Sequence, residues 1–228
     1  MTLHIEMVSD LVCPWCWVGL RRLKGAIALV SEVEVEVLFR PFELDPTIPA
    51  GGTDYKAYMK ARFGSDQSRD RANSMRDALI QYGQDEDIPF DFERITWRPN
   101  SFNAHRLVHW AQGQSLGMAA KEALFSAYFA KGLDIGDHEV LVTIAAEIGL
   151  DPNIVSDLLT SEADVETVRG EQNLFRQMGV SGVPTFIALR QIAVQGAESS
   201  EKLARFLKTA AAQMPQERPL EGASEESA

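Results

Sequence analysis

Two cysteines separated by two residues, Cys13 and Cys16, are the side chains of this sequence best suited to do chemistry. They are the only cysteines among 228 residues, and they stand in the segment Cys-Pro-Trp-Cys. The alternating run from Leu3 to Val8 precedes them and an apolar-periodic segment follows, which predicts a strand leading into the first turn of a helix. Unpaired backbone N–H groups and the helix dipole stabilise a thiolate at that position. The pattern therefore predicts thiol–disulfide exchange.

The same pair has two other interpretations, an inert buried couple and half of a zinc site. Structural zinc needs four ligands, and no histidine of this chain stands at zinc-finger spacing from the cysteines. His105 and His109 lie one turn apart on a predicted helix, but no carboxylate signature accompanies them, which is more typical of packing. We therefore expect no metal site. The histidines considered are His4, His105, His109 and His138.

A second candidate feature is Pro184, which begins a predicted strand in the segment Gly182 to Phe186. A proline at this place near a redox pair is a candidate for a cis peptide bond with Val183. A cis bond turns the carbonyl and N–H before the proline outward, where they can pair with an extended peptide or with glutathione. A trans proline that only starts the strand is the alternative. We expect Val183 and Pro184 to bind substrate.

The elements that would position these residues follow from apolar periodicity. The pattern is helical from 54 to 178, where we expect five to seven helices. The remaining elements predicted are a helix over 14–30, strands over 33–40, 184–189 and 191–194, and a closing helix over 199–214. Helices are expected to end at Gly64, Gly83, Gly117, Gly132, Gly149 and Gly179 and to start at Asp66, Asp137 and Asp151.

This order predicts an α/β protein with a thioredoxin fold, in which a large all-helical insertion separates the β-α-β and β-β-α halves. The thioredoxin-like domain would comprise residues 1–53 and 180–215, and the helical insertion residues 54–179. Residues 216–228 are acidic and poor in apolar side chains, which predicts a disordered tail.

Charge and hydropathy exclude several classes of partner. The chain has 33 acidic and 22 basic residues, a formal net charge of -11, and no cluster of Lys or Arg. We therefore expect neither nucleic acid nor a membrane as partner. The N-terminus has no basic or apolar leader, and no run approaches the about 20 apolar residues that span a bilayer. We expect a soluble, cytoplasmic protein, where a lone C-x-x-C is more often catalytic than structural.

Three segments, Ser9–Gly19, Pro99–Leu107 and Gly179–Phe186, are spread over most of the chain. Together they resemble the DsbA family of thioredoxin-fold oxidoreductases, most closely its FrnE-like branch. The resemblance implies that Cys13 is the exposed nucleophile and Cys16 the buried resolving thiol, in agreement with their places on the helix.

The resemblance also implies that Asn100 and His105 shape a substrate cleft between the insertion and the cysteines. Capping of a helix by Asn100 or Ser101 is the alternative. Pro14 and Trp15, between the two cysteines, are expected to set the reduction potential and to bind substrate, with Trp15 contacting apolar substrate segments at the rim.

Other side chains near the motif have less distinctive patterns. Trp17 is expected in the core. Three charged residues are candidate modulators of the cysteine pKa values, but ordinary solvated surface charges explain them better. These residues are Asp10, Arg40 and Glu43.

Three functions remain open from the sequence. The first is a dithiol–disulfide oxidoreductase or isomerase that acts on peptide or protein disulfides or on glutathione, with no tightly bound cofactor. The second is a glutathione-dependent isomerase or transferase of the 2-hydroxychromene-2-carboxylate isomerase or kappa type. Such enzymes carry serine at the position of Cys13, from which this chain departs. The third is a chaperone-like module that binds peptides around Trp15. The sequence does not indicate an oligomeric state.

Overall fold

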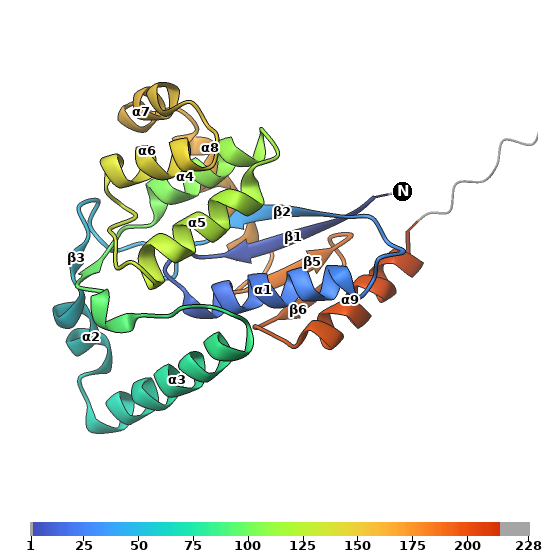
Figure 1. Ribbon diagram of the computed structural model, residues 1–228, viewed down its shortest axis with the longest axis horizontal. Coiled ribbons are helices and arrows are strands. Elements are labelled where there is room, and N and C mark those ends of the chain that lie inside the picture. Colours follow the sequence, from blue (N-terminus) through green and yellow to red (C-terminus); the bar gives the residue numbers. More distant parts are fainter. Residues whose placement is uncertain (1, 215–228) are drawn as a thin grey trace, which may run out of the picture.

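The computed structural model describes residues 2–214, and its centre is a four-stranded mixed sheet (Figure 1). The sheet order is β2-β1-β5-β6, with β1 parallel to β2 and β5 antiparallel to both β1 and β6. The strands are β1 (Leu3–Ser9), β2 (Val35–Pro41), β5 (Thr185–Ala188) and β6 (Ile192–Gln195).

Two helices complete the thioredoxin-like half of the molecule. Helix α1 (Pro14–Ala28) connects β1 to β2, and α9 (Ser200–Ala212) follows β6. The two helices pack against each other beside the sheet (Figure 1). This β-α-β and β-β-α order confirms the predicted thioredoxin fold, and the ends of these elements differ from the predicted ones by two residues or fewer.

The period of two along β1 explains how the sheet buries both faces. Ile5 and Met7 are fully buried in the main core with α1, whereas Val8 points to the opposite face. There Val8 packs with Ile187 and with Phe175 of helix α8 (Val165–Gln177). The start of α1 is therefore held by a sheet that is covered on both sides.

The insertion contains seven α-helices between residues 54 and 179, within the predicted number. Helices α4 to α7 lie on one side of α1 and helices α2 and α3 on the other (Figure 1). Besides α8, they are α2 (Tyr55–Phe63), α3 (Asp66–Asp85), α4 (Phe102–Gln112), α5 (Gly117–Phe129), α6 (His138–Glu147) and α7 (Pro152–Thr160).

The insertion is not all-helical, which corrects the prediction. Strands β3 (Thr53–Asp54) and β4 (Trp97–Arg98) form a two-stranded sheet, and η1 (Phe92–Arg94) is a short 3-10 helix. The Trp97 indole donates to the carbonyl of Gly51 at 3.0 Å beside this sheet. Strands of two residues are too short to show a period, so the sequence pattern did not reveal them.

The helix starts were predicted better than the ends. Asp137 and Asp151 cap α6 and α7 as predicted, because their carboxylates accept backbone N–H groups. Asp66 begins α3, but the cap is Ser65. Two glycine predictions were wrong: α3 continues through Gly83, and Gly117 begins α5 instead of ending a helix. A Cβ on Gly83 would lie 2.6 Å from the Phe90 ring, so packing explains this glycine.

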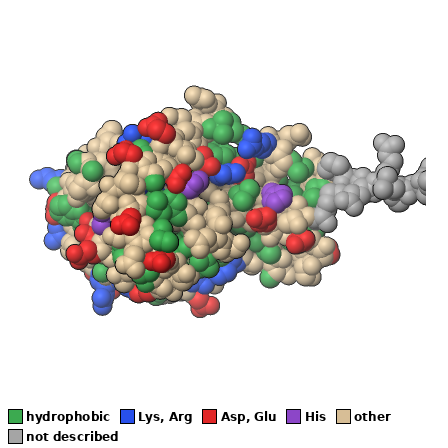
Figure 2. All heavy atoms as spheres, turned by 90° about the horizontal axis from the view of Figure 1, so that it is seen from above, with side chains coloured by type: hydrophobic (Ala, Val, Ile, Leu, Met, Phe, Trp, Pro, Cys, Tyr) green, Lys and Arg blue, Asp and Glu red, His purple; other side chains and the backbone are tan. Residues whose placement is uncertain are grey.

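Charges are mixed over the surface that Figure 2 shows, where acidic and basic side chains are interspersed. No helix within residues 2–214 is both long and apolar enough to cross a membrane. The predicted tail, residues 216–228, lies outside the described part of the chain. The domain boundaries given above stay a prediction.

Candidate active site

The N-terminal end of α1 presents the cysteine pair. Cys13 is the N-cap and Pro14 the first helical residue, where a missing N–H costs nothing. The N–H of Cys13 donates to the carbonyl of Asp10 at 3.2 Å, and that of Cys16 to the carbonyl of Cys13 at 3.0 Å. Both thiols are free. Cys13 is 5% exposed and therefore buried, which corrects the expectation of an exposed thiol, and Cys16 is 0% exposed.

The two halves of the fold meet at Cys13. The peptide bond between Val183 and Pro184 is cis. The Cys13 Sγ lies 3.8 Å from the carbonyl oxygen of Val183, 170 residues away in the chain, as a thiol donor to that carbonyl. The structure thus places Val183 directly against the sulfur of Cys13.

Gly19 makes this approach possible, although the sequence analysis did not single it out. A Cβ at this position would lie 2.8 Å from Cγ of Pro184 and 3.3 Å from the Phe186 ring. Only glycine lets the second turn of α1 pack this closely against the proline. Its place in the Ser9–Gly19 segment was the available signal.

A groove of about 460 Å³ opens in front of Cys13. Cys13, Pro14 and Trp15 line it together with residues of α2 and α3 and, from elsewhere in the chain, residues such as Phe92, Arg98 and Phe129. The Trp15 indole is half-buried and meets the Tyr82 ring edge-on with 5.6 Å between ring centroids. Trp17, in contrast, is 1% exposed and packs in the core, as expected. The rim position predicted for Trp15 agrees with this groove.

A buried carboxylate lies behind the cysteines. Asp10 is fully buried, which contradicts its interpretation as a solvated surface charge. Its oxygens accept from the Ser101 hydroxyl at 2.8 Å and from the Leu44 N–H at 2.7 Å. The Nε2 of His105 lies 3.5 Å from Oδ1. Burial alone would raise the pKa of Asp10, but His105, the charge of Arg98 and the Leu44 N–H together hold it below the usual value.

A buried lysine lies on the same side of the cysteine turn. Lys121 of α5 is 1% exposed, and its Nζ donates to the Ser9 hydroxyl at 2.7 Å. The Phe125 ring lies 4.9 Å from this ammonium group, within cation–π distance. Burial lowers the pKa of Lys121 to about 8, although the charges of Cys16, Asp10 and Cys13 act in the opposite direction. Nothing in its sequence neighbourhood indicated this position.

These surroundings change the pKa of the buried Cys16 thiol. Burial raises the pKa of Cys16 well above its ordinary value, and the neighbouring Cys13 raises it further. The positive charge of Lys121 opposes both causes. Lys121 is therefore the cation that favours the Cys16 thiolate in an otherwise apolar environment.

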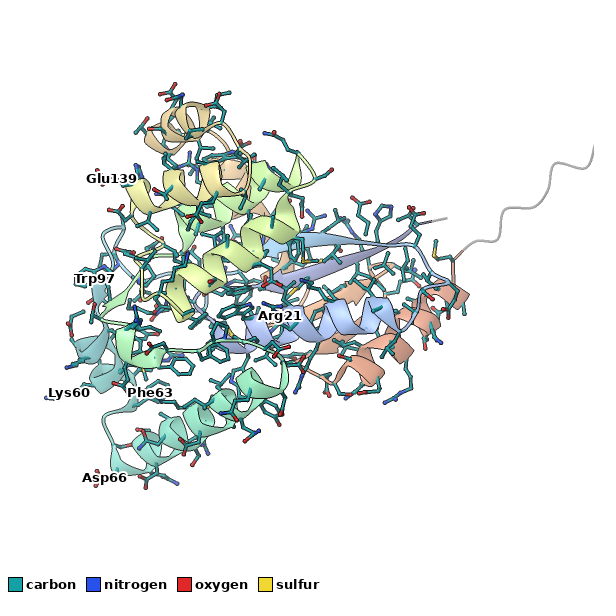
Figure 3. All side chains as sticks on the ribbon, in the orientation of Figure 1. Arg21, Lys60, Phe63, Asp66, Trp97 and Glu139 are labelled. Carbon is teal, nitrogen blue, oxygen red and sulfur yellow. The ribbon has the colours of Figure 1, made fainter. Side chains whose placement is uncertain are left out.

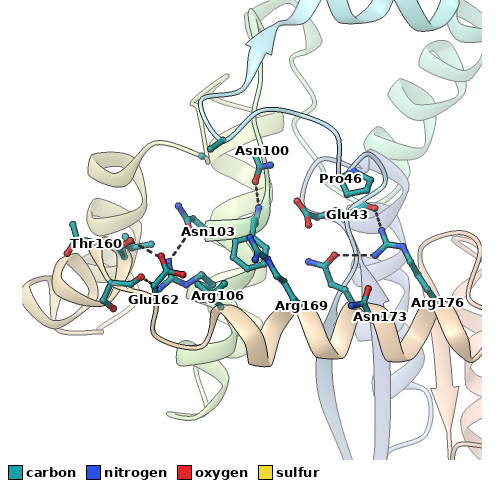
Figure 4. Close-up of a pocket in the computed structure, with 17 residues that line it drawn as sticks. Glu43, Pro46, Asn100, Asn103, Arg106, Thr160, Glu162, Arg169, Asn173 and Arg176 are labelled. Carbon is teal, nitrogen blue, oxygen red and sulfur yellow. Dashed lines mark hydrogen bonds between the residues drawn. The ribbon is translucent and has the colours of Figure 1, made fainter.

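Two predicted cleft residues occupy other places. Asn100 lines a separate cavity of about 720 Å³ that contains neither cysteine (Figure 4). Its amide donates to the carbonyl of Ile48 at 2.8 Å, and its Oδ1 accepts the Phe102 N–H at 2.9 Å. Asn100 therefore shapes the turn before α4, which favours the capping alternative over the cleft. Ser101 is the N-cap by position, but its hydroxyl is bonded to Asp10 instead.

His105 also lies outside the groove, because it is 3% exposed and faces Asp10. Arg40 is half-buried and bonds to Glu6 and Glu171 at 2.9 Å each, on the sheet and on α8. Glu43 is 9% exposed, and burial raises its pKa. Neither Arg40 nor Glu43 is a freely solvated charge, and the expectation for both is corrected.

Among residues 2–214, no group of three or more His, Cys, Asp or Glu side chains is arranged to hold a metal ion. The site is therefore described by its two thiols, the Val183 carbonyl, the groove in front and the buried charges behind. A thiol at a helix N-terminus beside the Val183 carbonyl is suited to thiol exchange with an extended disulfide.

The comparison with protein families agrees with this geometry. The model of the DSBA-like thioredoxin domain matches residues 4–208. The chain belongs to this family. The match spans both halves of the thioredoxin fold and the insertion between them, so the DSBA-like domain includes the groove as well as the cysteines.

Known relatives of this DSBA-like chain extend the comparison. A probable DsbA oxidoreductase of Streptomyces coelicolor is 29% identical, with a TM-score of 0.85 over 95% of this chain and 93% of that one. The uncharacterized protein YwbO of Bacillus subtilis is 28% identical over 193 residues, 82% of this chain and 87% of that protein. The cytosolic disulfide reductase DsbM of Pseudomonas aeruginosa, solved with glutathione, shares the fold at 19% identity and a TM-score of 0.62, over 92% of this chain and 100% of that one.

Proposed function

We propose that this protein is a dithiol–disulfide oxidoreductase that exchanges disulfides through Cys13 and Cys16. The observation that carries the proposal is the position of the Cys13 sulfur, at the N-terminus of α1, against the Val183 carbonyl and at the edge of the groove. Membership of the DSBA-like family supports the same chemistry.

The reaction begins with the dithiol form. The Cys13 thiolate attacks one sulfur of a substrate disulfide, so that a Cys13–substrate disulfide forms and the other half of the substrate leaves as a thiolate. Cys16 then loses its proton and attacks the Cys13 sulfur. The Cys13–Cys16 disulfide forms, the second substrate thiolate leaves, and the released proton ends on a product thiol or in solvent. Two electrons pass from the cysteine pair to the substrate.

The surroundings of the two sulfurs give Cys13 and Cys16 different roles in the reaction. Cys13 borders the groove and can reach a bound disulfide, whereas the fully buried Cys16 can reach only Cys13. Lys121 favours the Cys16 thiolate, which lowers the cost of the second step. Val183 offers its carbonyl, and Trp15 its ring, to the backbone or side chains of the substrate.

Glutathione is the proposed electron partner, in a cytoplasmic setting. The proposal is supported by DsbM, which shares this fold and whose structure was solved with glutathione. Peptide or protein disulfides, or mixed disulfides with glutathione, are the proposed substrates. The test is turnover of a fluorescent peptide disulfide with glutathione as reductant, using the wild type, Cys13→Ser, Cys16→Ser and the double variant.

Wild-type turnover that disappears in Cys13→Ser supports the proposal. Turnover that persists in the double variant contradicts it. A wild type that binds the peptide but shows no turnover, with binding unchanged in the double variant, would favour the peptide-binding alternative. A third result, glutathione-dependent isomerisation that survives replacement of both cysteines by serine, would favour the isomerase alternative. The thiol of Cys13 currently disfavours that alternative, because the related isomerases and transferases carry serine there.

A further inference from the structure

The groove in front of Cys13 has a charge that differs from that of the whole protein. Acidic residues outnumber basic ones by 33 to 22 in the chain. The described residues that line the groove nevertheless include three arginines, Arg62, Arg76 and Arg98, and no carboxylate. A concave surface of low polarity focuses such a positive field. The groove is therefore suited to an anion in a protein that otherwise repels anions.

The three arginines are not equally available. Arg98 is 5% exposed, its guanidinium lies 5.1 Å from the Tyr58 ring centroid, and it donates to the carbonyl of Pro99 at 3.3 Å. The buried charge of Asp10 also interacts with it. Because Arg98 is already compensated inside the protein, we assign it to the floor of the groove and not to ligand binding.

Arg76 and Arg62 are the available pair. Arg76 of α3 lies 5.5 Å over the Phe92 ring and bonds to Glu93, whose side chain is 85% exposed. Ion pairs that are open to water contribute little, so an incoming carboxylate can compete for this guanidinium. Arg62, exposed on α2, forms no salt bridge with any described carboxylate, and its charge is one of the minor causes that lower the pKa of Asp45.

The rest of the groove is apolar and rich in aromatic rings. Phe63, which Figure 3 labels at the end of α2, lines the groove together with Phe92 and Phe129. Met59 and Met75 add flexible thioethers that adapt to flat rings. Trp15 brings this apolar surface next to the attacking sulfur. Such a lining favours a flat apolar body over a highly polar one.

We infer that the groove selects disulfides that carry a carboxylate on an aromatic or other flat apolar body. Arg62 and Arg76 receive the carboxylate, the apolar lining holds the body, and Cys13 attacks the disulfide sulfur by the exchange step described above. This inference rests on the proposed function. It makes Arg62 and Arg76 specificity residues, because neither touches the reacting sulfurs.

A matched pair of aromatic disulfides tests the inference. Bis(nitrobenzoate) disulfide carries a carboxylate on each ring, and dipyridyl disulfide is neutral at pH 7. Both release coloured thiolates or thiones, so the second-order rate constant of the reduced protein with each can be measured by stopped flow. Dividing each rate constant by that of a small free thiol removes the intrinsic difference in reactivity.

The informative variants are Arg62→Met, Arg76→Met and their combination. We expect the double variant to react with the anionic disulfide roughly tenfold or more slowly, the size of a lost charge-assisted contact. Its rate with the neutral disulfide should stay within about twofold of the wild type, which also shows that the groove and the thiols are intact. Arg62→Lys and Arg76→Lys should keep part of the preference for the anionic disulfide, because the positive charge remains although the planar guanidinium group is lost.

Arg71→Met is the matched control. Arg71 is exposed on the same helix, α3, but does not line the groove. It removes one positive charge, as Arg62→Met and Arg76→Met each do, so a loss as large as in those single variants would indicate general steering and overturn the inference. Equal losses for both disulfides, or no loss in the double variant, would also overturn it.

The proposed function fails in a different way. If the wild-type protein reacts with neither disulfide faster than an unstructured dithiol peptide, the result contradicts the proposed disulfide exchange and, with it, the inference. If the neutral disulfide reacts well but the arginine variants change nothing, only the inference about the substrate is wrong.

Discussion

The two sides of the cysteine turn differ in almost every physical property. In front of Cys13 lies an open groove with aromatic and methionine side chains. Behind it lie Asp10 and Lys121, a carboxylate and an ammonium group that are 0% and 1% exposed. A side chain in the groove can select substrates without altering the fold, whereas a buried charge affects both the stability of the fold and the pKa values of the cysteines. Substrate recognition and thiol reactivity therefore depend on different residues.

The largest expected effect is on the chemistry itself. In Cys16→Ser the first exchange can occur but the second cannot, so the Cys13–substrate disulfide should accumulate and turnover should fall to background. Mass spectrometry of the intact protein and its peptides locates the adduct. Cys13→Ser should form no adduct under the same conditions. Adducts on Cys16 in Cys13→Ser at the wild-type rate would contradict the division into a thiol that borders the groove and one that does not.

Asp10→Asn tests the buried side most severely. Removing one member of a compensated buried group leaves His105 and Arg98 without their partner, so we expect a loss on the order of 3 kcal/mol in the free energy of unfolding. Because the pKa of Asp10 is lowered in the fold, its stabilisation is present above the unfolded value of 3.8 and is lost as pH falls through the folded value. The difference in the free energy of unfolding between the wild type and Asp10→Asn should therefore shrink as the solution becomes acidic.

Urea unfolding at several pH values measures this difference. Asp85→Asn, an exposed position on α3, is the control and should change stability by less than about 0.5 kcal/mol. An Asp10→Asn protein as stable as this control would show that the carboxylate is not held by the network described.

Lys121→Met should raise the free energy of unfolding, whereas Asp10→Asn should lower it. Because burial lowers the pKa of Lys121, its charged form is disfavoured in the fold, and an apolar side chain of similar length should stabilise the protein by about 1–3 kcal/mol near pH 7. The pKa of Lys121 is about 8 in the fold against 10.5 for the free side chain, so the burial cost is complete below pH 8 and is relieved as pH rises toward 10.5. The stability difference between variant and wild type should shrink over that window.

The same variant tests the effect of Lys121 on the sulfurs. Because the lysine charge lowers the pKa of Cys16, its loss should make the disulfide less oxidising, by on the order of 30 mV, which is tenfold in the exchange equilibrium. Lys131→Met, an exposed position just after α5, is the control. An unchanged reduction potential in a folded Lys121→Met protein would limit Lys121 to a structural role.

Gly19→Ala tests the close packing of α1 against Pro184, and it has the smallest expected effect. The added methyl group would lie 2.8 Å from Pro184, so we expect about 1–2 kcal/mol of destabilisation and slower exchange as Val183 moves from Cys13. Gly170→Ala in α8 adds a methyl group with nothing within 4 Å, and it should stabilise the helix by roughly 0.5–1 kcal/mol. Equal behaviour of the two variants would contradict the tight packing.

Sequence reasoning predicted the residues next to the groove better than the buried charges behind the cysteines. The C-x-x-C spacing and Pro184 have local signals, and the period of two in β1 predicts which residues enter the core. Asp10 and Lys121 have no such signal, since their charges predict solvent and their burial depends on partners that are 34 to 112 residues away. Asn100 was misplaced for a related reason: a short polar residue before a helix suits both a turn and a cleft.

The most direct test of the central claim is the redox equilibrium of the wild-type cysteine pair across a series of glutathione ratios, read by thiol alkylation and mass. The account predicts a reversible loss of two hydrogens that joins Cys13 to Cys16, with a single midpoint and no stable glutathione adduct. A protein that remains a dithiol at every ratio, or that stops at a lasting glutathione adduct on Cys13, would contradict it.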